Sequence, residues 1–346
     1  MMGIKPAVFS RGFLCQRSSS TPERPCKGLA SRGFIFALLF ALLSMASSAK
    51  AADRSLEEIL QPIDLGDGVY YFYGSLENRT PLNQGVTNNI GFVVTDAGVV
   101  LIDSGPSHQV AAQITEAVAS MTAKPIVQVV SLGSQDHRWL GNDYFVSHGA
   151  ELIALTRTAT TQANTADQHV QRLTRALGEE ALAGTVPKVA EQPIDADRHE
   201  WTMGQHRFAL VFAGDGHFPG DAMLHLPDQG IVFTGDIVYT ERMLGIHPWT
   251  NPVEQLAAFD TMVGWNPRVV VPGHGAATDV AEATRDTGDY LRHLVTEVRQ
   301  GIENWENLDE VVERLADLPQ FQHLRHYDDW HRMNINRTYL FIEQNP

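Results

Sequence analysis

The stretch VVSLGSQDHRWLGN, from Val129 to Asn142, joins an apolar run to two side chains that commonly bind metals. The run Ile126 to Val130 is rich in β-branched residues and predicts a buried strand. It ends in small polar residues, and Asp136 and His137 follow a few positions later. A carboxylate and an imidazole at the end of a strand are well suited to hold a cation. The stretch therefore predicts a strand that carries metal ligands at its end.

Strands and helices alternate on both sides of this stretch. The apolar runs 90–94 and 99–102 are joined by Asp-Ala-Gly at 96–98, which predicts a β-hairpin. Apolar residues at helical spacing predict helices over 108–121 and 252–263. We therefore expect an α/β fold with layers of helix on sheet.

The first 51 residues have the pattern of a signal peptide. Basic residues precede the apolar run FIFALLFALLSMA at 34–46, and Ala49-Lys50-Ala51 fits a small-x-small cleavage site. The run is too short to cross a bilayer comfortably, and an uncleaved N-terminal anchor is the alternative. We expect a periplasmic or secreted protein without stable membrane insertion. Its expected parts are the signal peptide 1–51, an exposed leader 52–67 and one domain, 68–346.

Charge and cysteine content exclude several kinds of function. The net charge is −15, which argues against nucleic acid as a partner. Both cysteines, Cys15 and Cys26, precede the predicted cleavage site, so the predicted mature chain has neither a thiolate ligand nor a cysteine nucleophile. The sequence contains no Gly-x-Ser-x-Gly elbow and no phosphate loop, so serine hydrolase and nucleotide chemistry have no support.

Possible metal ligands recur at four predicted strand ends. They are Asp136 with His137, then His217, Asp236 and His274. A single histidine is more commonly a surface or core residue, and a single Gly-Asp pair is as often a turn. Four such positions, each at the end of a predicted strand, indicate one shared site. Imidazole and carboxylate ligands predict zinc, with manganese or iron as alternatives.

The order of these motifs resembles the metallo-β-lactamase superfamily over roughly Val69 to the C-terminus. The similar segments are VVLIDSG at 99–105, GHFPGD at 216–221, FTGD at 233–236 and PGHG at 272–275. In DHRWLGNDYF and RMNINRTYLFIEQ the chain looks most similar to exported zinc metallohydrolases associated with quinoprotein and sulfur-oxidation systems. The resemblance implies an αββα sandwich with a metal site at one edge of the sheets, and a periplasmic redox system as a partner.

The resemblance also shows where this chain departs from the family. The family's first motif, His-x-His-x-Asp-His, falls on 132–137, so Leu132 and Ser134 replace its two leading histidines. The first of the family's two metals would keep only His217. The ligands implied for the second metal are all present: Asp136, His137, His274 and Asp236, which normally bridges both ions. We expect one ion instead of two, beside a pocket made partly apolar by Leu132.

Two functions are compatible with this reduced site. The first is a mononuclear hydrolase of an ester, lactone, thioester or amide, because one ion can still lower the pKa of a bound water. Its expected catalytic residues are Asp236 and His217, the latter as a proton shuttle or as an orienting group for the substrate carbonyl. The second function is a catalytically inactive periplasmic binding or scaffold protein that kept the fold. The substrate is unknown, and the expected determinants of specificity include 239–249 and 156–200.

Overall fold

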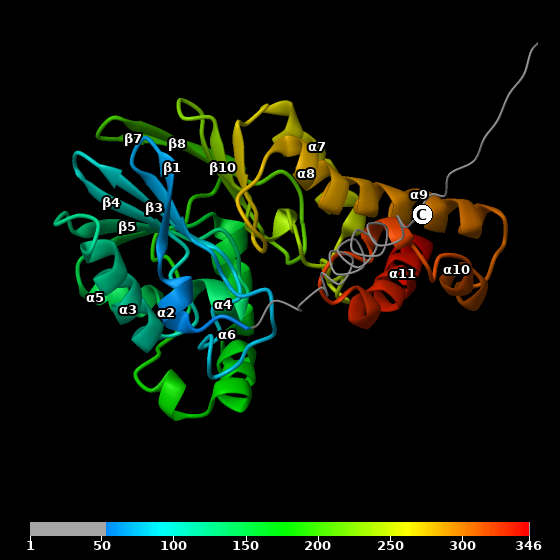
Figure 1. The fold of residues 1–346 in the computed structure, drawn as a ribbon, viewed down its shortest axis with the longest axis horizontal. Coiled ribbons are helices and arrows are strands. Elements are labelled where there is room, and N and C mark those ends of the chain that lie inside the picture. The colour runs from blue at the N-terminus through cyan, green and yellow to red at the C-terminus, as the bar shows by residue number, and fades with distance from the viewer. Residues whose placement is uncertain (1–52, 346) are drawn as a thin grey trace, which may run out of the picture. The chain divides into compact units, whose positions relative to one another are not determined.

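The computed structural model of the protein describes residues 53–345, and the predicted signal peptide lies outside them. Within this range the strands form two sheets (Figure 1). The first has six strands in the order β1 (Pro62–Gly66), β2 (Val69–Phe72), β3 (Ile90–Thr95), β4 (Gly98–Ile102), β5 (Ile126–Val130) and β6 (Glu151–Ile153). The second has five in the order β11 (Val269–Val271), β10 (Ile231–Phe233), β9 (Met223–Leu226), β8 (His206–Val211) and β7 (Arg198–Met203).

The hairpin predicted at 90–102 is present as β3 and β4, with Thr95 paired to Gly98. Gly98 has a φ of +140°, a conformation that residues with a Cβ rarely adopt, and this explains the glycine in the turn. Strands β4, β5 and β6 run parallel, as do β10 and β11. Because parallel strands end at the same edge, the segments that follow β4 and β5 are neighbours there.

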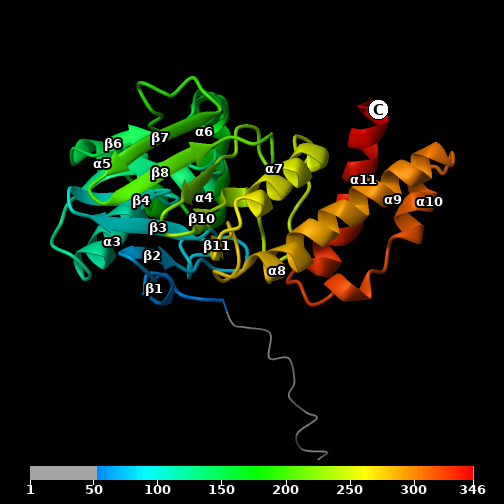
Figure 2. The same ribbon diagram turned by 90° about the horizontal axis from the view of Figure 1, so that it is seen from above.

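Apolar side chains from both sheets form the central layer of the molecule. Val93 and Val130 from the first sheet pack with Phe208 and Leu224 from the second. The outer face of the first sheet is covered by α2 (Leu56–Ile59), α3 (His108–Ala119) and α5 (Asn142–Ser147), and the outer face of the second by α7 (Pro252–Gly264). Figure 1 shows α2, α3 and α5 below the strands and α7 on the upper side, and Figure 2 gives the view from above. The αββα sandwich is confirmed.

The last helices gather at one end of the sandwich (Figure 1). Their shared core also takes in the loop at 239–246, which lies over the strand ends. The remaining helices are α4 (Asp136–Trp139), α6 (Thr156–Leu177), α8 (Val280–Ala283), α9 (Asp289–Glu303), α10 (Leu308–Arg314) and α11 (Tyr327–Gln344). Among the described residues, no helix combines the length and apolar character needed to cross a membrane.

The segment expected to be an exposed leader belongs instead to the fold. Residues 56–59 form α2, whose Leu56 and Ile59 are buried against the first sheet. Pro62–Gly66 is β1, the edge strand that pairs with β2. The sequence suggested an exposed segment because most of its side chains are polar. An edge strand such as β1 needs few buried side chains, so its polar sequence did not reveal that it belongs to the sheet.

Candidate functional site

The candidate site lies where strands of both sheets end. Two backbone hydrogen bonds join the sheets there, from Ala222 N to Leu132 O (2.7 Å) and from Asn89 N to Gly273 O (2.8 Å). His137 follows β5 on the short helix α4, Asp236 lies in the 3-10 turn after β10, and His274 follows β11. Three distant segments of the chain thus deliver their side chains to one place.

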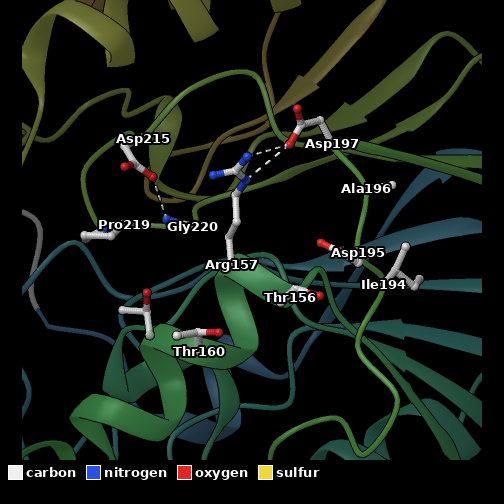
Figure 3. Close-up of a pocket in the computed structure, with 11 residues that line it drawn as sticks. Thr156, Arg157, Thr160, Ile194, Asp195, Ala196, Asp197, Asp215, Pro219 and Gly220 are labelled. Carbon is white, nitrogen blue, oxygen red and sulfur yellow. Dashed lines mark hydrogen bonds and ion pairs between the residues drawn. The ribbon is translucent and has the colours of Figure 1, made fainter.

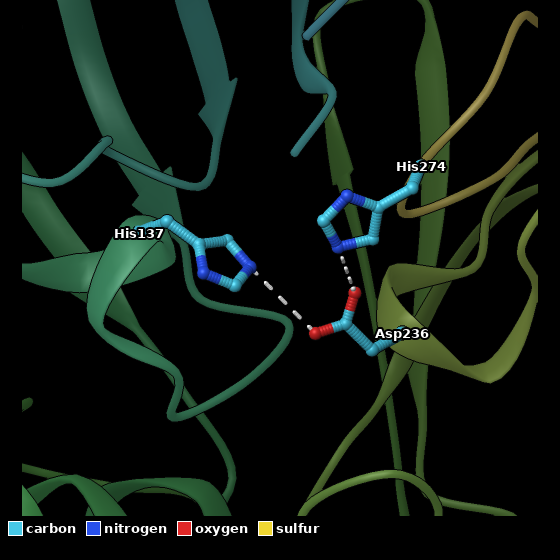
Figure 4. Close-up of side chains that lie close together, drawn as sticks. All are labelled: His137, Asp236 and His274. Atoms are coloured by element: carbon cyan, nitrogen blue, oxygen red, sulfur yellow. Dashed lines mark ion pairs between the residues drawn. The ribbon is translucent and has the colours of Figure 1, made fainter. Parts of the chain in front are cut away.

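The side chains of His137, Asp236 and His274 converge in a buried group. One potential ligand atom from each lies within 4.8 Å of the others. Figure 4 shows both imidazoles directed at the carboxylate. Nε2 of His274 is 3.2 Å from Oδ1 of Asp236, and Nε2 of His137 is 3.8 Å from Oδ2. Three protein ligands of this type, with an open position, are the arrangement of catalytic zinc sites.

Arg138 supplies a fixed positive charge to the same carboxylate. Its guanidinium is 1% exposed, donates to both oxygens of Asp236 and also donates to Asp103. Burial alone would raise the pKa of Asp236, but the charge of Arg138 and the neighbouring imidazoles of His137 and His274 hold it well below its usual range. Gln135 donates a further hydrogen bond to Asp236. The carboxylate that would bridge two ions in the family is therefore held ionised by a side chain.

Asp136 does not join the group of three. Its carboxylate accepts hydrogen bonds from Arg79 (3.0 Å from Nε) and Arg172 (2.6 Å from Nε), and lies 3.1 Å from Nδ1 of His137. Burial acts to raise the pKa of Asp136, but the two guanidinium groups and His137 outweigh it and lower that pKa. In this geometry Asp136 orients His137 and balances two arginines.

Leu132 and Ser134 occupy the positions of the two missing histidines, and neither lines the cavity beside the site. Leu132 packs in the apolar layer between the sheets, and Ser134 is fully buried. The pocket expected to be partly apolar because of Leu132 is polar instead, because the leucine side chain belongs to the core.

The cavity beside the group has a volume of about 170 Å³. His137 and His274 line it, together with His217, Tyr239 and His247. The ring of His217 lies 4.8 Å from that of His247 and 5.5 Å from that of Tyr239, outside the group that converges on Asp236. Among the predicted site residues, His217 is thus placed on the cavity wall and not in the group of three.

Three of the imidazoles around the cavity, those of His217, His247 and His274, are neutral near pH 7. Burial lowers the pKa of His217 to about 4, that of His274 to about 3 and that of His247 to about 2. Burial likewise lowers the pKa of His169, on the neighbouring helix α6, to about 4. Neutral imidazoles are the form that binds metals or accepts a proton.

His169 makes stability dependent on pH. An unfolded histidine binds a proton below about pH 6.5, whereas the folded protein excludes that proton from His169 until about pH 4. The free energy of unfolding contributed by this group therefore falls as the pH falls through that interval. Between pH 6.5 and about pH 4.5 the free energy of unfolding should fall in both proteins. We expect the fall to be about 2 kcal/mol smaller in His169→Asn than in the unchanged protein. Urea unfolding at a series of pH values measures this difference, and parallel curves for the two proteins would contradict it.

Sequence reasoning missed the arginines of the site. Arg79, Arg172 and Arg242 line the cavity. Arg172 and Arg242 lie in the segments 156–200 and 239–249, which were expected to determine specificity, but no pattern marked these arginines as site residues. Arg138 follows Asp136 and His137 directly in the sequence, and the structure buries it against Asp236. The sequence signal that could have identified Arg138 as a site residue is its position directly after Asp136 and His137.

Comparison with known proteins agrees with this architecture. Residues 142–274 match the family model described as "Metallo-beta-lactamase superfamily". A metallo-beta-lactamase from Pontibacter korlensis is 19% identical over 67% of this chain and 98% of its own, with a TM-score of 0.55. The sec-alkylsulfatase Pisa1 from Pseudomonas sp. is 15% identical over 80% of this chain and 49% of its own, with a TM-score of 0.63. The DIM-1 metallo-beta-lactamase is 14% identical over 67% of this chain and 96% of its own, with a TM-score of 0.51.

The fold is an αββα sandwich, and three potential metal ligands converge where its strands end. Residues 142–274 are thus similar to the metallo-beta-lactamase superfamily, whose members are metal-dependent hydrolases and often bind zinc. The matched segment begins after the motif position 132–137, and the solved structures, at 14–19% identity, establish the fold alone.

Proposed function

We propose that the protein is a metal-dependent hydrolase that uses one ion, held by His137, Asp236 and His274. The observation that carries this proposal is the convergence of three ligand atoms within 4.8 Å at the wall of a cavity. Zinc is the expected ion, with manganese or iron as alternatives. The bond cleaved is that of an ester, lactone, thioester or amide. A periplasmic or secreted location, and association with a redox system there, belong to the same proposal and are supported by the sequence of residues 1–51 and the motif resemblance.

The chemistry of His137 fits a metal ligand. Its Nε2 atom is buried and has no hydrogen-bond partner among the described residues. A buried polar atom without a partner is costly, and a bound cation would remove that cost. Its Nδ1 atom lies 2.8 Å from Nη2 of Arg79 and 3.1 Å from the carboxylate of Asp136, and these contacts fix the orientation of the ring.

The protein side chains have distinct parts in the proposed reaction. A bound ion lowers the pKa of a water molecule and polarises the substrate's carbonyl group. Arg138 keeps Asp236 ionised and fixes both of its oxygens. Nδ1 of His217 is buried without a partner among the described residues, so this neutral imidazole can accept a proton there or orient the substrate.

A specific contact favours the second candidate, a binding protein without catalysis. Arg242 Nη1 lies 3.4 Å from Nδ1 of His274, and because a guanidinium only donates, this places the imidazole proton on Nε2, facing Asp236. With Arg138 and Gln135 also donating, the Asp236 carboxylate is satisfied by side chains alone. A site arranged in this way can keep its shape without an ion.

His137→Gln separates the two candidates. We expect the purified protein, never exposed to chelator, to contain close to one equivalent of metal by elemental mass spectrometry, and the variant to lose it. Because Nε2 of His137 makes no hydrogen bond within the described residues, the fold should tolerate this change. Hydrolysis of a panel of esters, lactones, thioesters and amides should disappear with the metal.

His199→Gln is the matched control, since His199 lies on β7, apart from the site, and its loss should change neither metal content nor turnover. Absence of metal even after reconstitution, with no turnover, would support the binding protein. Two equivalents per chain would contradict the single-ion site.

A further inference from the structure

The cavity beside the site has a wall chemistry that the metal proposal does not use. Three of its described lining residues are arginines, Arg79, Arg172 and Arg242, and none is an aspartate or glutamate. The four lining histidines are His137, His217, His247 and His274. A small cavity that presents guanidinium groups and no carboxylate favours an anion.

Arg242 is the least compensated of these cations. It is half-buried, and its side chain contacts the carbonyl oxygen of Glu77 (3.3 Å) and the ring of His274 (3.4 Å). Within residues 53–345 no carboxylate forms an ion pair with it. A partly buried guanidinium without a counter-ion is unfavourable, and an anionic ligand would correct this.

The other two arginines share one carboxylate. Asp136 accepts from both Arg79 and Arg172, so one negative charge faces two positive ones. Nη2 of Arg172 is buried and has no hydrogen-bond partner among the described residues. Together with Arg242, this group has an excess of two positive charges and an unused buried donor. That excess points to an oxyanion, which accepts several N–H groups at once.

Arg172 also borders a second hollow, of about 370 Å³, which has an apolar wall. Phe218 and Trp249 line it, with their rings 4.8 Å apart. Trp249 is 44% exposed although it is a large apolar side chain. Exposed aromatic surface next to a cationic cavity is suited to a ligand with one charged and one apolar part.

We propose that the cavity binds the oxyanion group of an amphiphilic small molecule, whose apolar part lies against Phe218 and Trp249. Arg242, Arg172 and Arg79 hold the carboxylate, sulfate or phosphate group. As a statement about the substrate this rests on the proposed hydrolase function, whereas the binding itself requires no turnover. The ester, lactone, thioester or amide group of such a substrate would be a separate group, located between its arginine-bound oxyanion and its apolar part, near His217.

A larger hollow elsewhere on the described surface has the opposite chemistry and serves as a control. It measures about 620 Å³, and its walls carry three carboxylates, Asp195, Asp197 and Asp215 (Figure 3). The arginine there, Arg157, is paired with Asp197 at 3.1 Å. A cation whose charge is already balanced has no excess to offer an anion.

Calorimetric titration with hexyl phosphate, hexanoate, inorganic phosphate and hexan-1-ol tests the proposal. We expect at least one of the two amphiphilic anions to bind more tightly than inorganic phosphate, and hexan-1-ol to bind weakest. Arg242→Gln should weaken binding of that anion about tenfold to a hundredfold, since a charge-assisted contact is lost. Arg172→Gln should weaken it in the same direction, and Arg157→Gln should leave it unchanged. Circular dichroism of each variant checks that the fold is intact.

The same titrations on metal-free protein separate this proposal from the hydrolase function. Anion binding that persists without metal, and that is lost with Arg242, supports the arginine cavity even if no hydrolysis is found. Binding that requires metal and is indifferent to the Arg242 and Arg172 changes would overturn it. Equal binding of hexan-1-ol and the anions would overturn it as well.

Discussion

Replacing Arg138 by leucine is expected to destabilise the protein by about 3–5 kcal/mol, because it leaves two buried carboxylates without their cation. Asp103 and Asp236 are each about 1% exposed, and both receive hydrogen bonds from this guanidinium. Asp103 also accepts from the backbone of Leu132, so its displacement would disturb the end of β5. Urea unfolding followed by circular dichroism measures the loss.

Arg292→Leu is the matched control for this experiment. Arg292 pairs with Asp260 at 2.9 Å, but its side chain is 46% exposed, and removing such a surface pair costs at most about 1 kcal/mol. Arg138→Lys should fall between the two, because an ammonium keeps the charge but cannot reach two carboxylates in the same planar geometry. Equal effects of the Arg138 and Arg292 changes would contradict the structural role of Arg138.

Much of the fold could be predicted from local patterns. The hairpin at β3 and β4 has a turn sequence between two apolar runs, and β5 has a clear end where polar residues begin. Helix α7 begins after Asn251, which caps it, and has proline in its first turn. These signals lie within a few residues of the elements they define. Residues 53–67 lacked such a signal, because β1 is an edge strand whose side chains are largely exposed.

The positions of the site residues were predictable, but not the directions of their side chains. Asp136, His137 and Arg138 are consecutive in one short helix, where successive side chains point about 100° apart. The sequence marks the three as a group without stating which one faces Asp236. The structure directs His137 and Arg138 towards it and turns Asp136 towards Arg79 and Arg172.

The long-range arginines were beyond sequence reasoning for a different reason. Arg79 lies 57 residues before Asp136 in the chain, and Arg242 lies 32 residues before His274. Neither has a local pattern that indicates its partner, since only the folded sheets bring these segments together. The ligands at the strand ends could therefore be predicted from local sequence, whereas the ion pairs that balance charge at the site are visible only in the folded structure.

Restoring the two missing histidines is not expected to create a second metal site. In a Leu132→His, Ser134→His variant the first new imidazole would lie in the apolar layer between the sheets, because Leu132 packs there and not on the cavity wall. The charge of Arg138 on Asp236 would also repel a second ion. We expect an unchanged metal-to-protein ratio and a stability loss of about 2–5 kcal/mol from the lost leucine and the buried polar rings.

Leu140→His is the matched control for this variant. Leu140 is 1% exposed and belongs to a different apolar cluster, so its replacement measures the free-energy cost of burying an imidazole outside the motif. Elemental analysis and urea unfolding of both variants compare the two sites. A double variant that gained one equivalent of metal without losing stability would contradict this expectation. It would mean that the guanidinium of Arg138 can leave Asp236 and does not prevent a second ion from binding. If the double variant loses stability as the Leu140 variant does and gains no metal, then this part of the chain is adapted to the guanidinium of Arg138 and not to a second ion. In that case the change at 132–134 is matched by the burial of Arg138, and repairing the motif alone cannot reverse it.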